Sequence, residues 1–175
     1  MTETLPGDLP DDVDDTVMHV LKSACDQDIM IATAESCTGG LIASLLTDVT
    51  GCSHAFERGF VVYTNEAKNQ MLGVPEALLE NPGPVSEEVA RAMAEGALAH
   101  SNAHLAISIT GFAGPAGPDD EPGLVHFALA RRNRPTVHRM ERFGDIGRGG
   151  VRLECARTSL SMLREEIDAT ESVEQ

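Results

Sequence analysis

Short apolar runs rich in β-branched residues alternate with segments of helical hydrophobic spacing over the first two thirds of the chain. The predicted strands are 29–34, 55–63 and 103–110, and the predicted helices between them are 41–49, 64–71 and 86–100. Strands that alternate with helices are typical of α/β folds with a parallel sheet. This alternation constrains the fold most, because each helix must bury its apolar side against a face of the sheet.

The last third of the chain departs from this alternation. Two consecutive strands are predicted at 124–130 and 136–143 with no helix between them, and a final helix is predicted from 148 to 167. Two strands in direct succession favour an antiparallel hairpin, which would make the sheet mixed. With a first helix over Val13–Ala24, the predicted fold class is a three-layer α/β/α sandwich with a mixed, largely parallel sheet.

The length of 175 residues and the hydrophobic fraction of 42% suit one domain with a self-sufficient core. The first residues are rich in Pro, Gly and Asp, and the last are acidic. We therefore expect a loose tail at 1–10, a single domain at 11–167 and an acidic tail at 168–175.

The charge balance limits the partners that the chain can bind. Its 13 basic and 28 acidic side chains give a net charge of -15, so its long-range field repels nucleic acids and anionic membranes. The four cysteines form no C-x-x-C pair and no histidine stands at ligand spacing, which gives no support for a metal site. We expect no cofactor, no nucleic-acid or membrane partner, and a cytoplasmic protein.

Two glycine-containing segments follow predicted parallel strands, Ser36–Gly40 and Thr110–Pro115. Ligands of open α/β sheets gather at the carboxyl ends of such strands, so the two segments are expected to share one cleft. Glycines let a ligand approach the backbone, and amides at a helix N-terminus can hold a phosphate or an oxyanion. Ordinary strand-to-helix turns would give the same pattern.

Lys68 is one of only two lysines, against 11 arginines. A desolvated lysine can lose its proton near neutral pH, whereas an arginine cannot. Tyr63, the only tyrosine, ends the preceding predicted strand, and its hydroxyl could orient a serine or a lysine. The alternatives are that Lys68 is an ordinary surface lysine and that Tyr63 is a core residue whose hydroxyl reaches solvent.

Three segments, 34–40, 56–68 and 108–115, together resemble the CinA C-terminal domain family of nicotinamide-nucleotide amidases, also called nicotinamide mononucleotide deamidases or competence/damage-inducible proteins. The resemblance runs from about Val13 to Ile167. It implies metal-free hydrolysis of the carboxamide of nicotinamide mononucleotide to nicotinate mononucleotide and ammonia. The family's larger members carry a second, N-terminal domain for which this chain has no room, so the stand-alone form is expected.

The resemblance implies roles for individual residues. Ser36 is the expected nucleophile, Lys68 its base, and Tyr63 matches the family's tyrosine. The substrate-binding residues that it implies are Thr38, Gly39, Gly40, Thr110, Gly111 and Arg148. Amides of the Thr38–Gly40 turn are expected to hold the oxyanion.

The sequence departs from the family pattern near its end. The family usually reads G-D-R-x-x-V-R, whereas here Gly144–Asp145 is separated from Arg148 by two residues. Aligning Val151 and Arg152 with the pattern places Arg148 on the first arginine, where it and Arg152 could contact a phosphate. A solvated arginine at a helix start is the alternative.

Two functions of different classes remain open from the sequence. The first is a serine-type nucleotide amidase that acts on a small-molecule nucleotide and is expected to form a homo-oligomer. The second is a non-catalytic nucleotide-binding or regulatory module, which should tolerate Lys68→Arg because it needs only a permanent cation. Direct DNA binding conflicts with the net charge.

Overall fold

The computed structural model describes residues 10–114, 117 and 120–171, and the predicted N-terminal tail lies almost wholly outside these residues. The elements, in chain order, are α1 (Asp11–Asp26), β1 (Ile31–Glu35), α2 (Leu41–Leu45), β2 (Phe56–Val61), α3 (Asn65–Leu72), α4 (Glu76–Glu80), α5 (Glu87–Ala99), β3 (Leu105–Gly111), β4 (Leu124–Arg131), β5 (Val137–Arg142) and α6 (Gly147–Glu171).

The strands form one sheet in the order β2-β1-β3-β4-β5. β1 is parallel to both β2 and β3, whereas β4 is antiparallel to β3 and to β5. The predicted hairpin is thus present, and the mixed α/β/α sandwich is confirmed. The carboxyl ends of β1, β2 and β3 meet at one edge of the sheet.

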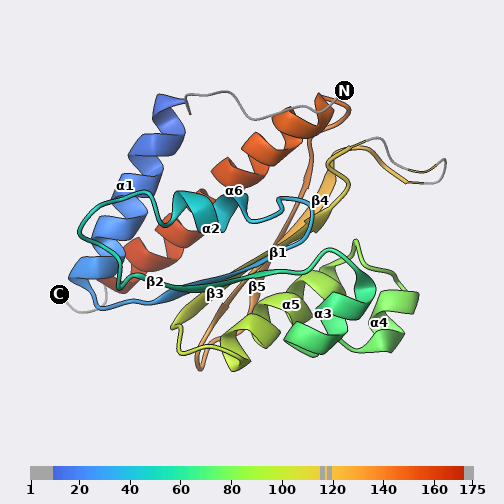
Figure 1. Cartoon of the computed structure of the whole chain (residues 1–175), viewed down its shortest axis with the longest axis horizontal. Helices are drawn as coiled ribbons and strands as arrows, with labels where there is room; N and C mark the ends of the chain where they lie inside the picture. Colours follow the sequence, from blue (N-terminus) through green and yellow to red (C-terminus); the bar gives the residue numbers. More distant parts are fainter. Residues whose placement is uncertain (1–9, 115–116, 118–119, 172–175) are drawn as a thin grey trace.

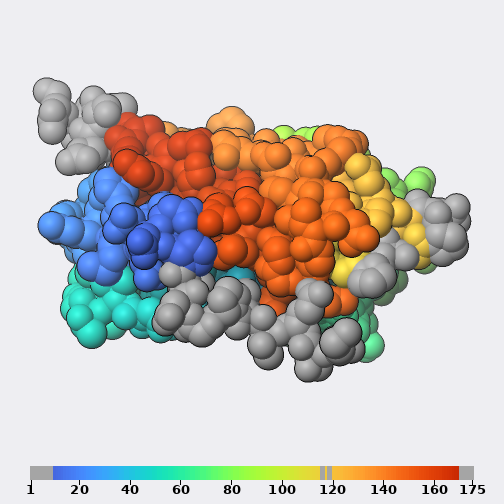
Figure 2. Space-filling view, turned by 90° about the horizontal axis from the view of Figure 1, so that it is seen from above, coloured from blue at the N-terminus to red at the C-terminus, as the bar shows by residue number. Residues whose placement is uncertain are grey.

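Helices cover both faces of the sheet. α1, α2 and α6 pack on one face, and α3, α4 and α5 lie on the other (Figure 1). Seen from above, α1 and α6 lie side by side across the first face (Figure 2). The two faces have different side chains, because alternate residues of each strand point to opposite sides.

The face toward α5 is lined by small side chains. Its buried residues include Ala32, Ala34, Ala106, Ala128 and Ala130, whereas Ile, Leu, Val and Phe fill the face toward α6. Small side chains let α5 approach the strands closely, and the hydroxyl of Ser108 donates a 2.6 Å hydrogen bond to the carbonyl of Ala90 in α5. The α3 to α5 layer is therefore held near the sheet.

Two of the three helices of this layer, α3 and α5, begin where the sequence predicts. The Thr64 hydroxyl accepts a hydrogen bond from the amide of Ala67 at the start of α3, and Gly73 ends that helix with a left-handed φ of 68°. Ser86 caps α5 in the same way, through the amide of Val89. These caps fix the start of α3, which carries Lys68.

Two helix ends and one short helix differ from the prediction. α2 ends at Leu45 rather than near Val49, and the short helix α4 was not predicted. α6 continues to Glu171, so residues 168–171 are helical instead of belonging to an acidic tail. Residues 172–175 lie outside the described part. None of the helices described combines the length and the apolarity needed to cross a bilayer.

Gly96→Ala should destabilise the fold. A Cβ at Gly96 in α5 would overlap the carbonyl oxygen of Leu72 at the end of α3, and backbone yields less easily than a side chain. We expect the free energy of unfolding to fall by about 1–3 kcal/mol in urea denaturation.

Gly150→Ala in α6 is the matched control. There the added Cβ meets only the flexible side chain of Ile146, at 3.2 Å. Alanine is favoured over glycine in a helix by up to ~1 kcal/mol, so this variant should not lose stability. Equal unfolding curves for the Gly96→Ala variant and the wild type would contradict the close α3–α5 contact.

Candidate active site

Ser36 stands directly after β1, where the strand ends between its two parallel neighbours. All five residues of β1 are buried, and the amide of Ser36 continues the sheet by donating to the carbonyl of Ile109 at 3.0 Å. The side chain of Ser36 is itself buried at the floor of a pocket. The serine is therefore placed by the central strands and not by a free loop.

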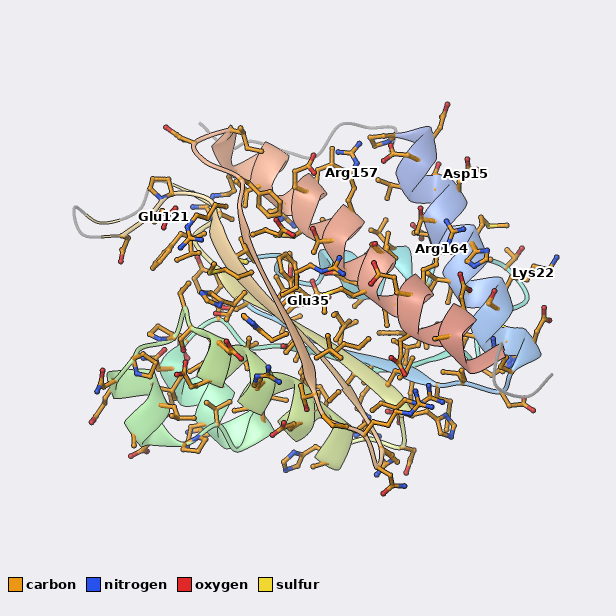
Figure 3. All side chains as sticks on the ribbon, turned by 180° about the vertical axis from the view of Figure 1, so that it is seen from behind. Asp15, Lys22, Glu35, Glu121, Arg157 and Arg164 are labelled. Atoms are coloured by element: carbon orange, nitrogen blue, oxygen red, sulfur yellow. The ribbon has the colours of Figure 1, made fainter. Side chains whose placement is uncertain are left out.

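The residue before it, Glu35, carries a fully buried carboxylate. Its oxygens accept hydrogen bonds from the amides of Gly40, Ile42 and Ala43 at 3.0, 3.1 and 2.8 Å. These are amides of the first turn of α2, which lack partners inside the helix. Glu35, which is labelled in Figure 3, thus ties the end of β1 to the start of α2 and closes the turn that holds Ser36.

Lys68 reaches the serine from the other helical layer. Its ammonium nitrogen Nζ lies 3.1 Å from Ser36 Oγ and 3.2 Å from the carbonyl oxygen of Tyr63. Only 2% of Lys68 is exposed. Two residues that are 32 positions apart are therefore in hydrogen-bond contact within the interior.

Burial lowers the pKa of Lys68 from its ordinary value, and the nearby Cys37 thiol opposes this shift. Desolvation disfavours the ammonium form because the low-dielectric interior solvates a charge poorly. The neutral amine is therefore more accessible here than on a surface lysine. A neutral amine within hydrogen-bond reach of a hydroxyl can accept its proton.

The pocket above this pair is built from five separate stretches of the chain. Its lining residues are Ser36, Cys37, Tyr63, Asn65, Lys68, Pro84, Val85, Thr110, Gly111, Phe112, Ala113, Gly114 and Arg148. The two predicted ligand segments, after β1 and after β3, do meet in one pocket. It lies at the carboxyl ends of β1, β2 and β3, as expected for an α/β sheet.

Tyr63 lines the pocket but does not orient the serine–lysine pair through its hydroxyl. Its side chain is 67% exposed, and its contact with Lys68 is made by the backbone carbonyl. Among the described residues, no hydrogen bond of the Tyr63 hydroxyl is found. The ring forms part of the pocket rim, from which it can contact a ligand.

The Thr38–Gly40 turn differs from the prediction. Gly39 donates its amide to the carbonyl of Ser36, and Gly40 donates to Glu35, so these two amides are engaged within the turn. None of Thr38, Gly39 and Gly40 lines the pocket. The prediction that the amides of Gly39 and Gly40 hold an oxyanion is wrong. Gly39 and Gly40 adopt left-handed φ angles of 63° and 94°, which the turn requires and which glycine adopts most easily.

Thr110 and Gly111 both line the pocket, at the end of β3. The Thr110 hydroxyl donates to the carbonyl of Pro84 at 2.7 Å, which leaves its oxygen as an acceptor toward the pocket side. A Cβ at Gly111 would lie 2.6 Å from the carbonyl oxygen of Leu124. Gly111 is therefore required by the close approach of β4, independently of any ligand.

The two arginines at the start of α6 have different surroundings. Arg148 is exposed at the pocket wall, with its guanidinium against the backbone of Gly114. Arg152, in contrast, does not line the pocket: its Nε and Nη2 donate to the carbonyl oxygen of Thr38 at 3.2 and 2.8 Å. The phosphate contact predicted for Arg152 is not supported, whereas Arg148 stays available to a ligand.

Sequence reasoning missed Glu35 and Cys37 as parts of the site. An acidic residue directly after a buried strand and before a Gly-Gly helix start was the signal for Glu35, since α2 has no Ser, Thr or Asp at its N-cap, Gly40. Cys37 is close to Cys155 of α6, and this contact, with burial, raises the pKa of the Cys155 thiol. The cysteines are therefore not isolated from one another.

The fold and the site together define a three-layer α/β/α domain with a buried serine–lysine pair at the carboxyl ends of its parallel strands. The CinA C-terminal domain model matches residues 13–167, so the chain belongs to the CinA family. The resemblance seen in the sequence is thereby confirmed. No group of three His, Cys, Asp or Glu side chains able to hold a metal occurs among the residues described.

Individual relatives agree with this assignment. A CinA-like protein from Geobacter sulfurreducens is 48% identical over 141 residues, which cover 79% of this chain and 34% of that protein. The chain spans about a third of the length of the curated relatives that it matches first.

Solved structures match over nearly the whole chain. The competence/damage inducible protein CihA from Agrobacterium tumefaciens has a TM-score of 0.86 at 43% identity, with 95% of this chain and 99% of that chain covered. A competence-damaged protein (CinA) superfamily protein from Escherichia coli has a TM-score of 0.82 at 32% identity, with 89% and 92% covered.

Lys68→Met should stabilise the protein at neutral pH. Methionine fills a similar volume without a charge to bury. Below the lowered pKa of Lys68, the wild type carries the full cost of its buried ammonium; this cost disappears as the pH rises toward ~10.4, where lysine is neutral in both folded and unfolded chains. We expect the melting temperature to rise by a few degrees at pH 7, and by less at pH 10.

Lys22→Met is the matched control, because Lys22 is the other lysine and lies exposed on α1 (Figure 3). It should leave the melting temperature unchanged at both pH values. A lower melting temperature for the Lys68→Met variant at pH 7 would contradict a net cost of burying this lysine.

Proposed function

We propose that this domain is a nicotinamide-nucleotide amidase, which hydrolyses the carboxamide of nicotinamide mononucleotide to nicotinate mononucleotide and ammonia. The observation that carries the proposal is the 3.1 Å contact between Lys68 Nζ and Ser36 Oγ at the buried floor of the pocket. A serine hydroxyl is a weak nucleophile until a base accepts its proton. The lysine beside it is such a base.

The reaction proceeds through an acyl-enzyme. The neutral Lys68 amine accepts the Ser36 proton while Oγ attacks the carboxamide carbon and forms a tetrahedral intermediate. The intermediate collapses as the carbon–nitrogen bond breaks, and the Lys68 ammonium gives its proton to the leaving nitrogen, which departs as ammonia. A water molecule, deprotonated by Lys68, then attacks the ester, and the proton returns to Ser36 as nicotinate mononucleotide leaves.

The amide of Cys37 is the proposed donor to the oxyanion. Cys37 lines the pocket directly after the nucleophile, and its amide has no acceptor among the residues that the structure describes. The amide of Ser36 itself is already bound to the carbonyl of Ile109. A preorganised donor of this kind stabilises the charge that develops on the carbonyl oxygen.

Arg148 is the proposed contact of the substrate phosphate. Its guanidinium projects at the pocket wall and forms no ion pair with a carboxylate within the described ranges. In a chain with a net charge of -15, an unneutralised arginine in the pocket supplies the local attraction that an anionic nucleotide requires.

A nucleotide-binding module without catalysis is the competing function. It would also use Arg148 and the segment Thr110–Gly114 after β3, but it has no use for a lysine buried against a serine hydroxyl. The expected homo-oligomer and cytoplasmic location remain predictions alongside this proposal.

Ser36→Ala should abolish ammonia release from nicotinamide mononucleotide and leave nucleotide binding intact, because only the nucleophile is removed. Ammonia is followed with a coupled assay, and binding by calorimetry. Ser44→Ala, at an exposed serine of the neighbouring helix α2, is the control and should keep full activity. Substantial turnover by the Ser36→Ala variant would rule out the covalent route, and binding without turnover by the wild type would favour the module.

Arg148→Ala should raise KM for nicotinamide mononucleotide by roughly one to two orders of magnitude, since a charge-assisted contact contributes about 1.5–3 kcal/mol. Nicotinamide riboside, which lacks the phosphate, should be a poor substrate of the wild type. The variant should use the riboside no less well than the wild type does. An equal loss on both substrates would show that Arg148 does not act through the phosphate.

A further inference from the structure

Arg152 makes an unusual contact for an arginine in an acidic protein. Two of its nitrogens, Nε and Nη2, donate to a single backbone oxygen, that of Thr38, at 3.2 and 2.8 Å. The same oxygen accepts the amide of Leu41 at 3.3 Å. A half-buried guanidinium from α6 thereby holds one peptide group of the turn that follows the serine.

The other arginines of α6 show that this contact is not the default for the helix. Arg157 pairs with Asp12 and Glu154, and Arg164 pairs with Asp168, both on the outer side of the molecule. Arg148 and Arg152, one turn apart, have no carboxylate partner within the described ranges. Arg148 faces the pocket, and Arg152 faces the turn beneath it.

We propose that Arg152 is a positioning residue that holds the turn after Ser36 so that the Cys37 amide faces the reacting carbonyl. This inference rests on the proposed amidase function. Arg152 touches neither the substrate nor the reacting atoms. It acts through the carbonyl of Thr38, which belongs to the same peptide as the Gly39 amide. That amide donates to the carbonyl of Ser36, which belongs to the peptide of the oxyanion donor.

The turn is fixed at both ends, and within it the Gly39 amide donates to the carbonyl of Ser36, which belongs to the same peptide as the Cys37 amide. Before it, the Ser36 amide is bound to Ile109, and after it, Glu35 holds the amides of Gly40, Ile42 and Ala43. Between these points stand the amides of Cys37 and Thr38, which donate to no acceptor among the described residues. The contact from Arg152 is the side-chain restraint found there.

The chemistry favours arginine over lysine for this task. A guanidinium presents two donors along one planar edge and cannot rotate about its own end group, so it fixes the direction of the bound carbonyl. A lysine would supply a charge with a freely turning ammonium. The direction of the Thr38–Gly39 peptide therefore depends on the planar guanidinium of Arg152. Through the Gly39 amide, which donates to the carbonyl of Ser36, the direction of the Cys37 amide depends on it as well.

The kinetic test separates positioning from binding. Arg152→Ala should lower kcat about 10- to 100-fold with KM for nicotinamide mononucleotide changed by no more than about threefold, because a misplaced donor weakens the transition state more than the ground state. Arg152→Lys should show an intermediate loss, and added methylguanidine should partly restore the alanine variant. Arg164→Ala is the matched control on the same helix and should match the wild type.

A second readout does not require the natural substrate. A fluorophosphonate probe phosphonylates an activated serine with loss of fluoride, and the negative charge that develops on its phosphoryl oxygen uses the same donor. Mass spectrometry should find the wild type labelled at Ser36, and the Arg152→Ala variant labelled at least tenfold more slowly. If circular dichroism shows that the Arg152→Ala variant is unfolded, the labelling rate of the Arg152→Lys variant is compared with that of the wild type instead.

The outcomes are distinct. A rise in KM at unchanged kcat, or labelling of Ser36 at the wild-type rate, would overturn the positioning role. A wild type that reacts with the probe, slowed by the Arg152 change, but releases no ammonia from nicotinamide mononucleotide would leave the positioning role standing and overturn the proposed function. A wild type that does not react at Ser36 and releases no ammonia would overturn both.

Discussion

The fully buried carboxylate of Glu35 is the interaction on which the site depends. A carboxylate in the interior costs several kcal/mol unless its oxygens are hydrogen-bonded, and here three amides of the first turn of α2 satisfy them. Those amides would otherwise lack partners, because Gly40 at the N-cap has no side chain to offer. Strand and helix therefore need each other at this point, and Ser36 is the next residue along the chain.

The unequal faces of the sheet explain how a lysine reaches that serine. Alanines on the α5 side let the helical layer come close, and α3 is fixed against α5 at Gly96. Lys68 lies in the first part of α3, which Thr64 caps. Larger residues at Ala32 or Ala34 would push this layer outward and lengthen the contact between Nζ and Oγ. Packing far from the pocket thus determines a distance of 3.1 Å inside it.

Features that local sequence rules control, such as helix caps, could be predicted from the sequence. Features that depend on tertiary contacts, such as the partners of the turn amides, could not. The caps of α3 and α5 are read from Thr64, Gly73 and Ser86, so those helices were placed well. α4 was missed because five residues after Pro75 carry too little periodicity. The site residues Ser36, Lys68 and Thr110 do share a pocket, but which amides of the Ser36 turn are free depends on Glu35. The orientation of Arg152 depends on where α6 crosses the sheet, and no local pattern encodes it.

The contrast between Lys68 and Arg148 is the physical argument for catalysis over simple binding. Arg148 is an exposed cation at the pocket wall, which suffices to attract a phosphate and costs little to keep charged. Lys68 is buried, and desolvation lowers its pKa, so the fold makes its positive charge less favourable. A binding module gains nothing from a cation whose charge is suppressed. A base gains the neutral amine that it needs, held against the one hydroxyl from which it would take a proton.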